Sequence, residues 1–348
     1  MIGERCLSVD LADAVKILTP ESWSTRTICH AREFSSLMRK AVPSVVVLGA
    51  TGRVGRLVAA DWTGRGGLET RFQSRGQNRG RNARDAADAG WFFWSLSDGV
   101  GRLAEQIGAG VDGLVVLSGV TPAPGAEYRL NSALGLAALA AAREAGVGQV
   151  LLASSAAVYG RGTGAALDET APTLSETDYG RAKLAMEADC LAWQAAQGAG
   201  GPALCLLRIG NVAGTDQFFR NLVLATAEAP LVLDRFADGT SPVRSYIGPQ
   251  TLASVLAGLV RLAAGGRALP QVLNIGAPGG GLDMAAFVPA LEQAGLQPQV
   301  AFRAAPPGAL PVLRLDTRLL ASLCPMPSGA ALPSTMVAEW LRLRGDAA

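Results

Sequence analysis

Short apolar runs alternate with longer amphipathic stretches from Ser44 to about residue 213. Apolar residues at helical spacing predict helices, and continuous runs of β-branched and aromatic residues predict strands. Strand and helix alternating at this interval indicate a parallel, doubly wound α/β sheet, and apolar rather than alternating strands indicate burial on both faces. The predicted strands are 45–50, 68–74, 91–97, 111–119, 147–155 and 202–211, and the predicted helices are 52–62, 128–146 and 179–198.

The pattern loosens after about residue 213, where Pro and Gly become more frequent and helices such as 285–295 alternate with short loops. We expect a smaller substrate-binding region at 216–348 that closes over the carboxyl edge of the sheet, where ligands bind in open α/β folds. Residues 44–215 then form the dinucleotide-binding domain, and about 247–276 return to it. Residues 1–43 share none of this periodicity, and we assign no role to that extension.

Composition narrows the classes of function. Hydrophobic residues make up 49% of the 348 residues, charged residues 17%, and the net charge is +2. This balance favours neither a nucleic acid nor an anionic membrane as partner. No apolar run approaches the ~20 residues of a membrane span, and the charged N-terminus does not resemble a signal peptide. We therefore expect a cytoplasmic protein with a small-molecule substrate.

Histidine and cysteine usage excludes several kinds of site. The one histidine, His30, precedes the periodic part of the chain, so that part holds no Ser-His-Asp triad, H-E-x-x-H zinc site or histidine base. The five cysteines show no C-x-x-C spacing and are odd in number. They are typical of buried thiols in a reducing compartment. The sequence therefore predicts no metal site.

A glycine-rich segment, GATGRVG at 49–55, joins the first predicted strand to the first predicted helix. Such glycines permit a tight turn and close approach of the backbone to a pyrophosphate, which the helix N-terminus attracts. With 42 glycines in the chain the spacing alone is weak, but its position after the first strand favours dinucleotide binding. The candidate cofactor-binding residues are Gly49, Thr51, Gly52, Arg53, Val54 and Gly55.

The end of the second predicted strand bears on the choice of cofactor. NAD enzymes commonly place an acidic residue there for the ribose 2′-hydroxyl, whereas this chain has Gln73, Ser74 and Arg75. Arg75, helped by Arg79, can instead bind the 2′-phosphate of NADP through charge-assisted hydrogen bonds. We therefore predict NADP in preference to NAD, with Arg75 as its recognition residue.

Tyr179 and Lys183 in YGRAK lie one helical turn apart on the same face. Lys183 is the only lysine after residue 40. A cation beside a tyrosine favours the phenolate, and lowering its pKa from ~10 to ~7 corresponds to roughly 4 kcal/mol. Such a tyrosine can exchange a proton with a substrate hydroxyl near neutral pH. The pair therefore points to acid–base catalysis.

Taken together, these motifs resemble those of the extended short-chain dehydrogenases/reductases of the NAD-dependent epimerase/dehydratase type. The resemblance covers about residues 45–316. The resemblance implies a Rossmann-type sheet with a smaller C-terminal substrate-binding region. The matching segments are GATGRVG, the asparagine of YRLNSALG, SSAAVYG (154–160), DETAP (168–172), YGRAK (179–183), LRIGNVAG (207–214) and VRSYI (243–247).

The resemblance also implies roles for individual residues. Ser155 matches the hydroxyl that hydrogen-bonds the reacting substrate oxygen, with Ser154 as the neighbouring alternative. Tyr179 matches the acid/base. Lys183 matches the residue that lowers the pKa of that tyrosine and holds the nicotinamide ribose. Asn131 matches an asparagine that stabilises the region of the active-site helix.

Two further matches concern the substrate. Asn211 lies where the family contacts substrate beyond the sixth strand, and Arg244 matches an arginine that pairs with the diphosphate of a nucleotide sugar. The chain differs from the residues usual in this family at Ser95, at GPQTLA (248–253) and at Gly119. These differences weaken the assignment of a particular substrate and leave the Ser-Tyr-Lys set unchanged.

The function implied is an NAD(P)-dependent oxidoreductase that acts on a hydroxyl or keto carbon, as an epimerase or dehydratase of a nucleotide-diphosphate sugar. An NADPH-dependent carbonyl reductase is the first alternative, which Arg75 favours, and a non-catalytic dinucleotide sensor is the second. The resemblance also implies a homodimer formed through helix 128–146 and the helix from Tyr179. Apolar residues spread around helix 128–146 support that expectation.

Overall fold

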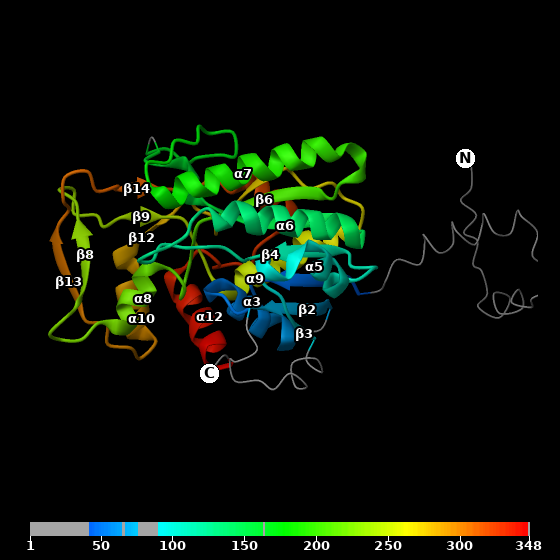
Figure 1. Cartoon of the computed structure of the whole chain (residues 1–348). Helices are drawn as coiled ribbons and strands as arrows, with labels where there is room; N and C mark the ends of the chain where they lie inside the picture. The colour runs from blue at the N-terminus through cyan, green and yellow to red at the C-terminus, as the bar shows by residue number, and fades with distance from the viewer. Residues whose placement is uncertain (1–41, 65–66, 76–89, 163, 347–348) are drawn as a thin grey trace, which may run out of the picture. The chain divides into compact units, whose positions relative to one another are not determined.

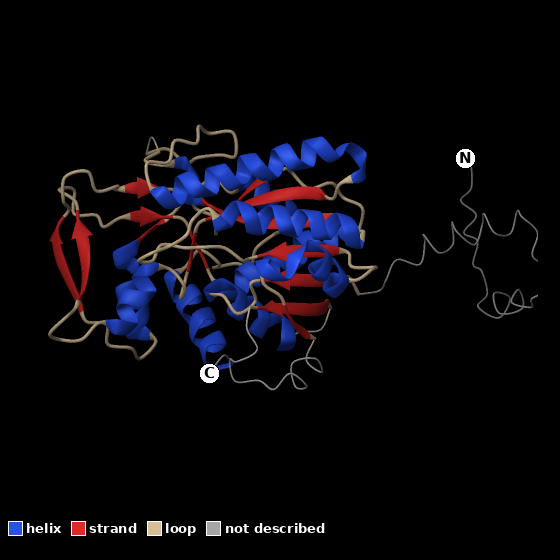
Figure 2. Ribbon diagram, in the orientation of Figure 1, coloured by secondary structure: helices blue, strands red, loops and turns tan. Residues whose placement is uncertain are grey.

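The strand predicted at 45–50 is an interior strand of a seven-stranded parallel sheet in the computed structural model, which describes residues 42–64, 67–75, 90–162 and 164–346 (Figure 1). Every strand pairs in parallel with its neighbours. This confirms the predicted doubly wound α/β fold (Figure 2). From one edge to the other the strands are β3 (Trp91–Phe93), β2 (Glu69–Ser74), β1 (Ser44–Leu48), β4 (Gly113–Val116), β5 (Gln149–Ser155), β6 (Ala203–Ile209) and β11 (Val272–Ile275).

Helices cover both faces of this sheet, as its continuous apolar strands require. Along β1, Val46 and Leu48 pack into one hydrophobic cluster and Val45 and Val47 into the other. The first cluster is closed by α5 (Gly99–Ile107), α6 (Leu130–Ala145) and α7 (Asp178–Gln197). The second is closed by α3 (Arg53–Gly64), α9 (Pro249–Ala264) and α11 (Arg318–Leu323).

The C-terminal region has an aromatic core of its own. Phe218, Phe219, Tyr246, Phe287 and Trp340 pack with ring centroids 4.7–5.7 Å apart. The helices of this region are α8 (Gln217–Leu224), α10 (Phe287–Gln293) and α12 (Pro333–Asp346). Its short strands pair as β7 (Asn211–Val212) with β10 (Tyr246–Ile247), as β12 (Leu282–Asp283) with β9 (Val243–Arg244) and β14 (Val312–Leu313), and as β8 (Leu231–Arg235) with β13 (Val300–Ala304), the ribbon at the left of Figure 1.

The sequence pattern differs from the structure within the sheet domain. Strand β11 and helix α9 lie in the part of the chain expected to return to this domain, and neither was predicted as an element. The strand predicted at 91–97 ends at Phe93, and a short 3₁₀ turn (Leu96–Asp98) follows it. Helix α5 was not predicted, because Gly99 and Gly101 at its start lower helix propensity. The helix is stabilised instead by burial of Leu103 and Ile107 against the sheet.

Other expectations lie partly beyond the residues described. The N-terminal extension was predicted for 1–43, and residues 1–41 lie outside the described residues. The boundary predicted near residue 215 stays a prediction. Among the helices described, none combines the length and apolarity that a membrane crossing requires.

Candidate active site

A cavity of about 620 Å³ opens at the carboxyl ends of β1, β4, β5 and β6. The sheet has a topological switch point here, because β1 pairs with β2 on one side and with β4 on the other. The cavity is lined by Thr51, Gly52, Arg53, Val54, Arg75, Leu117, Gly119, Thr121, Pro122, Ala153, Ser154, Ser155, Tyr179, Lys183, Ile209, Gly210, Asn211, Val212, Thr215, Asp216 and Gln217. Most of the site residues predicted from the sequence are among them; Gly49, Gly55, Asn131 and Arg244 are not.

The glycine loop is packed too closely for side chains. Gly49 has a φ of +81°, and a Cβ there would lie 2.4 Å from the backbone nitrogen of Ser118. A Cβ on Gly55 would lie 2.1 Å from the carbonyl oxygen of Gly49. Helix α3 begins at Arg53, so its unpaired N–H groups lie at the cavity wall. The loop and helix terminus can therefore hold the pyrophosphate of a dinucleotide.

We expect Gly55→Ala to lower the free energy of unfolding by about 1–3 kcal/mol, because the added methyl group meets backbone that cannot move aside. Dinucleotide binding should be lost with it. Gly101→Ala is the matched control, since a Cβ on this exposed helical glycine meets nothing within 4 Å. That change should stabilise by roughly 0.5–1 kcal/mol. Urea unfolding and calorimetric titration with dinucleotide measure both effects, and equal stability of the two variants would contradict the account.

Sequence reasoning missed a buried residue that fixes the glycine loop. The Oε1 atom of Gln73 accepts a hydrogen bond from the backbone N–H of Gly49 at 2.8 Å, and its Nε2 donates to the carbonyl of Trp94 at 2.5 Å. Gln73 is only 2% exposed. A polar side chain at the end of an otherwise buried strand is the signal that could have revealed this tether.

Ser155 and Tyr179 meet inside the cavity. Ser155 ends β5, and its Oγ accepts the N–H of Ala157 at 3.2 Å. Tyr179 lies in the first turn of α7 and lines the same cavity as Ser155, whose hydroxyl acts to lower the pKa of Tyr179. Gly180 permits this approach, because a Cβ there would lie 2.6 Å from the carbonyl oxygen of Ala157. The two hydroxyls predicted to hold the reacting oxygen thus lie together.

Burial raises the pKa of Tyr179, which is the opposite of the direction expected from the sequence. The hydrogen bond from Ser155 and the charge of Arg53 oppose that effect, and Tyr128 adds to it. The Nζ of Lys183 donates to the carbonyl of Ala153 at 2.9 Å. Burial lowers the pKa of Lys183 to about 8.

Ser154 and Ser155 have different partners. The Oγ of Ser154 donates to Glu187 Oε1 at 2.5 Å, and Glu187 forms a buried ion pair with Arg208, Nη2 to Oε2 at 2.8 Å. Arg208 also donates to the hydroxyl of Tyr159 at 3.1 Å. Ser154 is therefore held by a buried network beneath the cavity. Ser155 lies outside that network, and its role at the reacting oxygen stays a prediction.

Asn131 orders the segment that follows β4. Its Oδ1 accepts the N–H of Val120 at 3.1 Å, while its Nδ2 donates to the carbonyls of Val120 at 3.2 Å and Tyr128 at 3.0 Å. Asn131 is 1% exposed, and a Cβ on Gly119 would lie 2.9 Å from its Oδ1. In this arrangement Asn131 shapes the cavity wall from behind.

Asn211 lines the cavity together with an acidic residue that the sequence did not reveal. Asp216 Oδ2 accepts the Nδ2 of Asn211 at 2.9 Å and the hydroxyl of Tyr246 at 2.6 Å. Its Oδ1 accepts the N–H of Phe219 at 3.0 Å, so Asp216 also caps α8. Burial raises the pKa of Asp216. This carboxyl orients the Asn211 amide and leaves its oxygen available to a ligand.

Arg75 and Arg244, which the sequence assigned to the cofactor and to the substrate diphosphate, differ in position. Arg75 is exposed and lines the cavity at the end of β2; Arg79 lies outside the described residues. The guanidinium of Arg244 donates to the carbonyls of Val243 at 2.8 Å, Leu310 at 2.8 Å and Pro311 at 3.2 Å. It does not line the cavity, and its role at a diphosphate stays a prediction.

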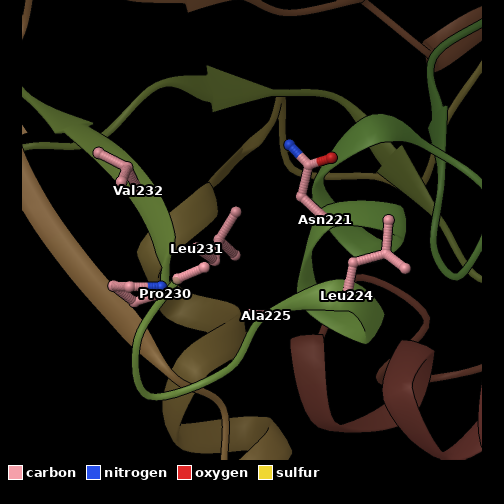
Figure 3. A pocket seen from close by; sticks show the side chains of 7 residues that line it. Asn221, Leu224, Ala225, Pro230, Leu231 and Val232 are labelled. Carbon is pink, nitrogen blue, oxygen red and sulfur yellow. The ribbon is translucent and has the colours of Figure 1, made fainter.

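A second, smaller pocket of about 320 Å³ lies between α8 and β8 (Figure 3). It contains none of the predicted site residues, and Asn221 is the one polar side chain that lines it. Over the described parts of the chain, no group of three His, Cys, Asp or Glu residues could hold a metal ion.

Comparisons with known proteins agree with this arrangement. The sequence profile of the NAD dependent epimerase/dehydratase family matches residues 45–244. The curated UDP-glucose 4-epimerase of Azospirillum brasilense is 39% identical over 89 residues, which make up 26% of this chain and 25% of that protein. The aligned segment thus spans a quarter of that relative's length.

Solved structures match much more of the chain. UDP-glucose 4-epimerase from Brucella ovis in complex with NAD superposes with a TM-score of 0.70 and 21% identity, covering 87% of this chain and 98% of that one. The enzyme of the same name from Stenotrophomonas maltophila, with bound NAD and formylated UDP-arabinopyranose, superposes with a TM-score of 0.67 and 21% identity. The match covers 87% of this chain and 98% of that one. At this identity the likeness shows a shared fold.

Proposed function

Because the chain belongs to the NAD-dependent epimerase/dehydratase family, we propose that it oxidises and reduces a hydroxyl-bearing carbon of a nucleotide-diphosphate sugar. The observation that carries this proposal is that Ser155, Tyr179 and the glycine loop line one cavity. Three buried cysteines with free thiols support a reducing compartment, and we place the reaction in the cytoplasm.

Each site residue has a distinct task in this proposal. A bound nicotinamide supplies the hydride acceptor for the substrate C–H bond. Ser155 orients the substrate oxygen, and the Tyr179 oxygen takes the hydroxyl proton in oxidation and returns it in reduction. Lys183 lies one turn further along α7 and holds the cofactor ribose. Asn211 presents its amide oxygen to the substrate, because its nitrogen is bonded to Asp216.

The nucleotide-sugar substrate is supported by the related proteins, whose names specify UDP-glucose. A carbonyl reductase remains the alternative that Arg75 favours. The two differ in the fate of the cofactor, because an epimerase recycles it and a reductase consumes one equivalent per product. Substoichiometric dinucleotide that sustains many conversions of UDP-glucose supports the epimerase, and a reaction that stops at one equivalent excludes it.

The preference for NADP is supported by the end of β2. The Gln73 side chain is hydrogen-bonded to the backbone of Gly49 and Trp94, whereas Arg75 is exposed at the cavity wall. We expect Arg75→Ala to weaken NADP binding by at least about 1–2 kcal/mol, the scale of a charge-assisted hydrogen bond, and to leave NAD binding nearly unchanged. Arg102→Ala, on the exposed side of α5, is the control because it removes the same charge elsewhere. Calorimetric titration tests this, and equal affinity of the parent for both cofactors would refute it.

The homodimer is supported by the exposed side of α7. Helices α6 and α7 pack side by side (Figure 1), and α7 exposes a row of alanines at 185, 188 and 192. We expect the parent to sediment as a dimer at micromolar concentration and Ala188→Arg to sediment as a monomer, because a desolvated charge opposes close helix packing. Ala109→Arg, at another exposed alanine, should remain dimeric. A monomeric parent contradicts the proposal.

A further inference from the structure

Arg53 crosses the cavity and joins three segments of the chain. It is the first residue of α3, directly after the glycine loop. Its Nη1 donates to the carbonyl of Thr215, which precedes α8, at 3.2 Å. Its Nη2 donates to the hydroxyl of Thr121, which follows β4. These anchors hold a cationic group at a fixed place in the same cavity as Tyr179.

Lys183 is directed elsewhere in this arrangement. Its Nζ donates to the carbonyl of Ala153 and lies 3.7 Å from the sulfur of Met186. The charge of Glu187 raises its pKa, against the effect of burial. The lysine expected to act on the tyrosine is thus engaged with the interior of the sheet and α7.

Tyr179 is faced by few groups. Ser155 lowers its pKa, and the Tyr128 ring lies 6.1 Å away between centroids. Arg53 is the cation whose charge acts on it. Arg53 is in turn attracted by Asp216 and repelled by Arg220 and Arg56. Arg75 and Asp216 complete the charged groups of the cavity wall together with Arg53 and Lys183.

We propose that Arg53, held across the cavity by Thr121 and Thr215, is a positioning residue that stabilises the phenolate of Tyr179. Arg53 and Tyr179 line one cavity, and the bonds to Thr121 and Thr215 hold the Arg53 guanidinium there. A guanidinium also keeps its charge throughout the working pH range. An opposite charge nearby favours the ionised form of a tyrosine. Arg53 therefore lowers the pH at which Tyr179 can accept a proton.

This inference rests on the proposed role of Tyr179, but its test needs neither substrate nor cofactor. The ultraviolet absorbance of tyrosinate is titrated in the parent and in Tyr179→Phe, and the difference isolates Tyr179 among the four tyrosines. The same pair of titrations is then made in the background of Arg53→Met, Arg53→Lys and Arg56→Met. Circular dichroism checks the fold of each variant.

We expect Arg53→Met to raise the pKa of Tyr179 by roughly one unit or more, the scale of losing a nearby opposite charge. Arg53→Lys should restore much of the original value, and Arg56→Met, on the exposed side of α3, should leave it unchanged. Thr121→Val keeps the charge but removes one anchor, and should give an intermediate shift even if Arg53→Met does not fold. With substrate, the pH profile of kcat should move upward in parallel.

An unchanged Tyr179 titration in folded Arg53→Met or in Thr121→Val overturns the proposal. If dinucleotide binding weakens while the titration stays the same, Arg53 is a cofactor-binding residue only, and the proposal is wrong. A titration that shifts as expected in a protein that converts no nucleotide sugar upholds the Arg53 inference and counts against the proposed function instead.

Discussion

Tyr179→Phe is expected to lower kcat by about 10²-fold or more while the protein folds and binds dinucleotide like the parent. The change removes one hydroxyl and almost no volume. Its hydroxyl partner in the protein is Ser155, which keeps its bond from Ala157. The missing proton acceptor matters most in the transition state, so KM should change less than kcat.

Tyr128→Phe provides a matched control for that measurement. Its ring lies 6.1 Å from the ring of Tyr179 and loses the same hydroxyl group. We expect this variant to retain most of the parental kcat. If Tyr179→Phe and Tyr128→Phe had the same kcat, the YGRAK segment would have no catalytic role. The glycine loop would then indicate a dinucleotide-binding domain only.

Lys183→Met is expected to stabilise the protein without cofactor by about 2 kcal/mol near neutral pH. Burial lowers the pKa of Lys183 from 10.5 to about 8, which corresponds to a cost of about 3 kcal/mol when the charged form is buried. The hydrogen bond to Ala153 offsets about 1 kcal/mol of that cost and is lost in the variant. The same change should weaken dinucleotide binding, because the predicted ribose contact is removed.

The pH dependence of this stabilisation has a definite sign. Between about pH 8 and pH 10.5 the unfolded chain binds a proton at Lys183 that the folded chain does not, so parental stability rises with pH across that window. The advantage of Lys183→Met should therefore be full below about pH 8 and be lost before pH 10.5, where the hydrogen bond to Ala153 favours the parent. Arg181→Met, on the exposed side of the same helix, should show no such window. Urea unfolding as a function of pH measures all three proteins, and a constant difference between Lys183→Met and the parent would exclude a depressed lysine pKa.

The doubly wound parallel sheet was predictable because the apolar pattern of each strand is local, whereas the order of the strands came only from the structure. Buried strands such as β1 and β5 carry runs of apolar residues that only a doubly covered sheet can bury. Helix α5 could not be predicted, because its stability comes from Leu103 and Ile107 reaching the sheet and not from its glycine-rich start.

The candidate site was predictable where one short segment carries the chemistry. Ser155 and Tyr179 come from compact motifs, and the structure places them together. Asp216 and Thr121 escaped notice because each acquires its role from residues distant in the sequence, Asn211 and Arg53. Spacing alone also could not show whether Lys183 acts on the tyrosine, since its direction depends on the carbonyl of Ala153.

The proposed function requires that this cavity convert a nucleotide sugar with recycled nicotinamide dinucleotide. Proton NMR of UDP-glucose incubated with the protein and substoichiometric NADP or NAD tests it most directly. The account predicts many epimerised sugar molecules per dinucleotide, and no conversion with Tyr179→Phe. Tight dinucleotide binding with no change in UDP-glucose or in a panel of other nucleotide sugars would contradict it.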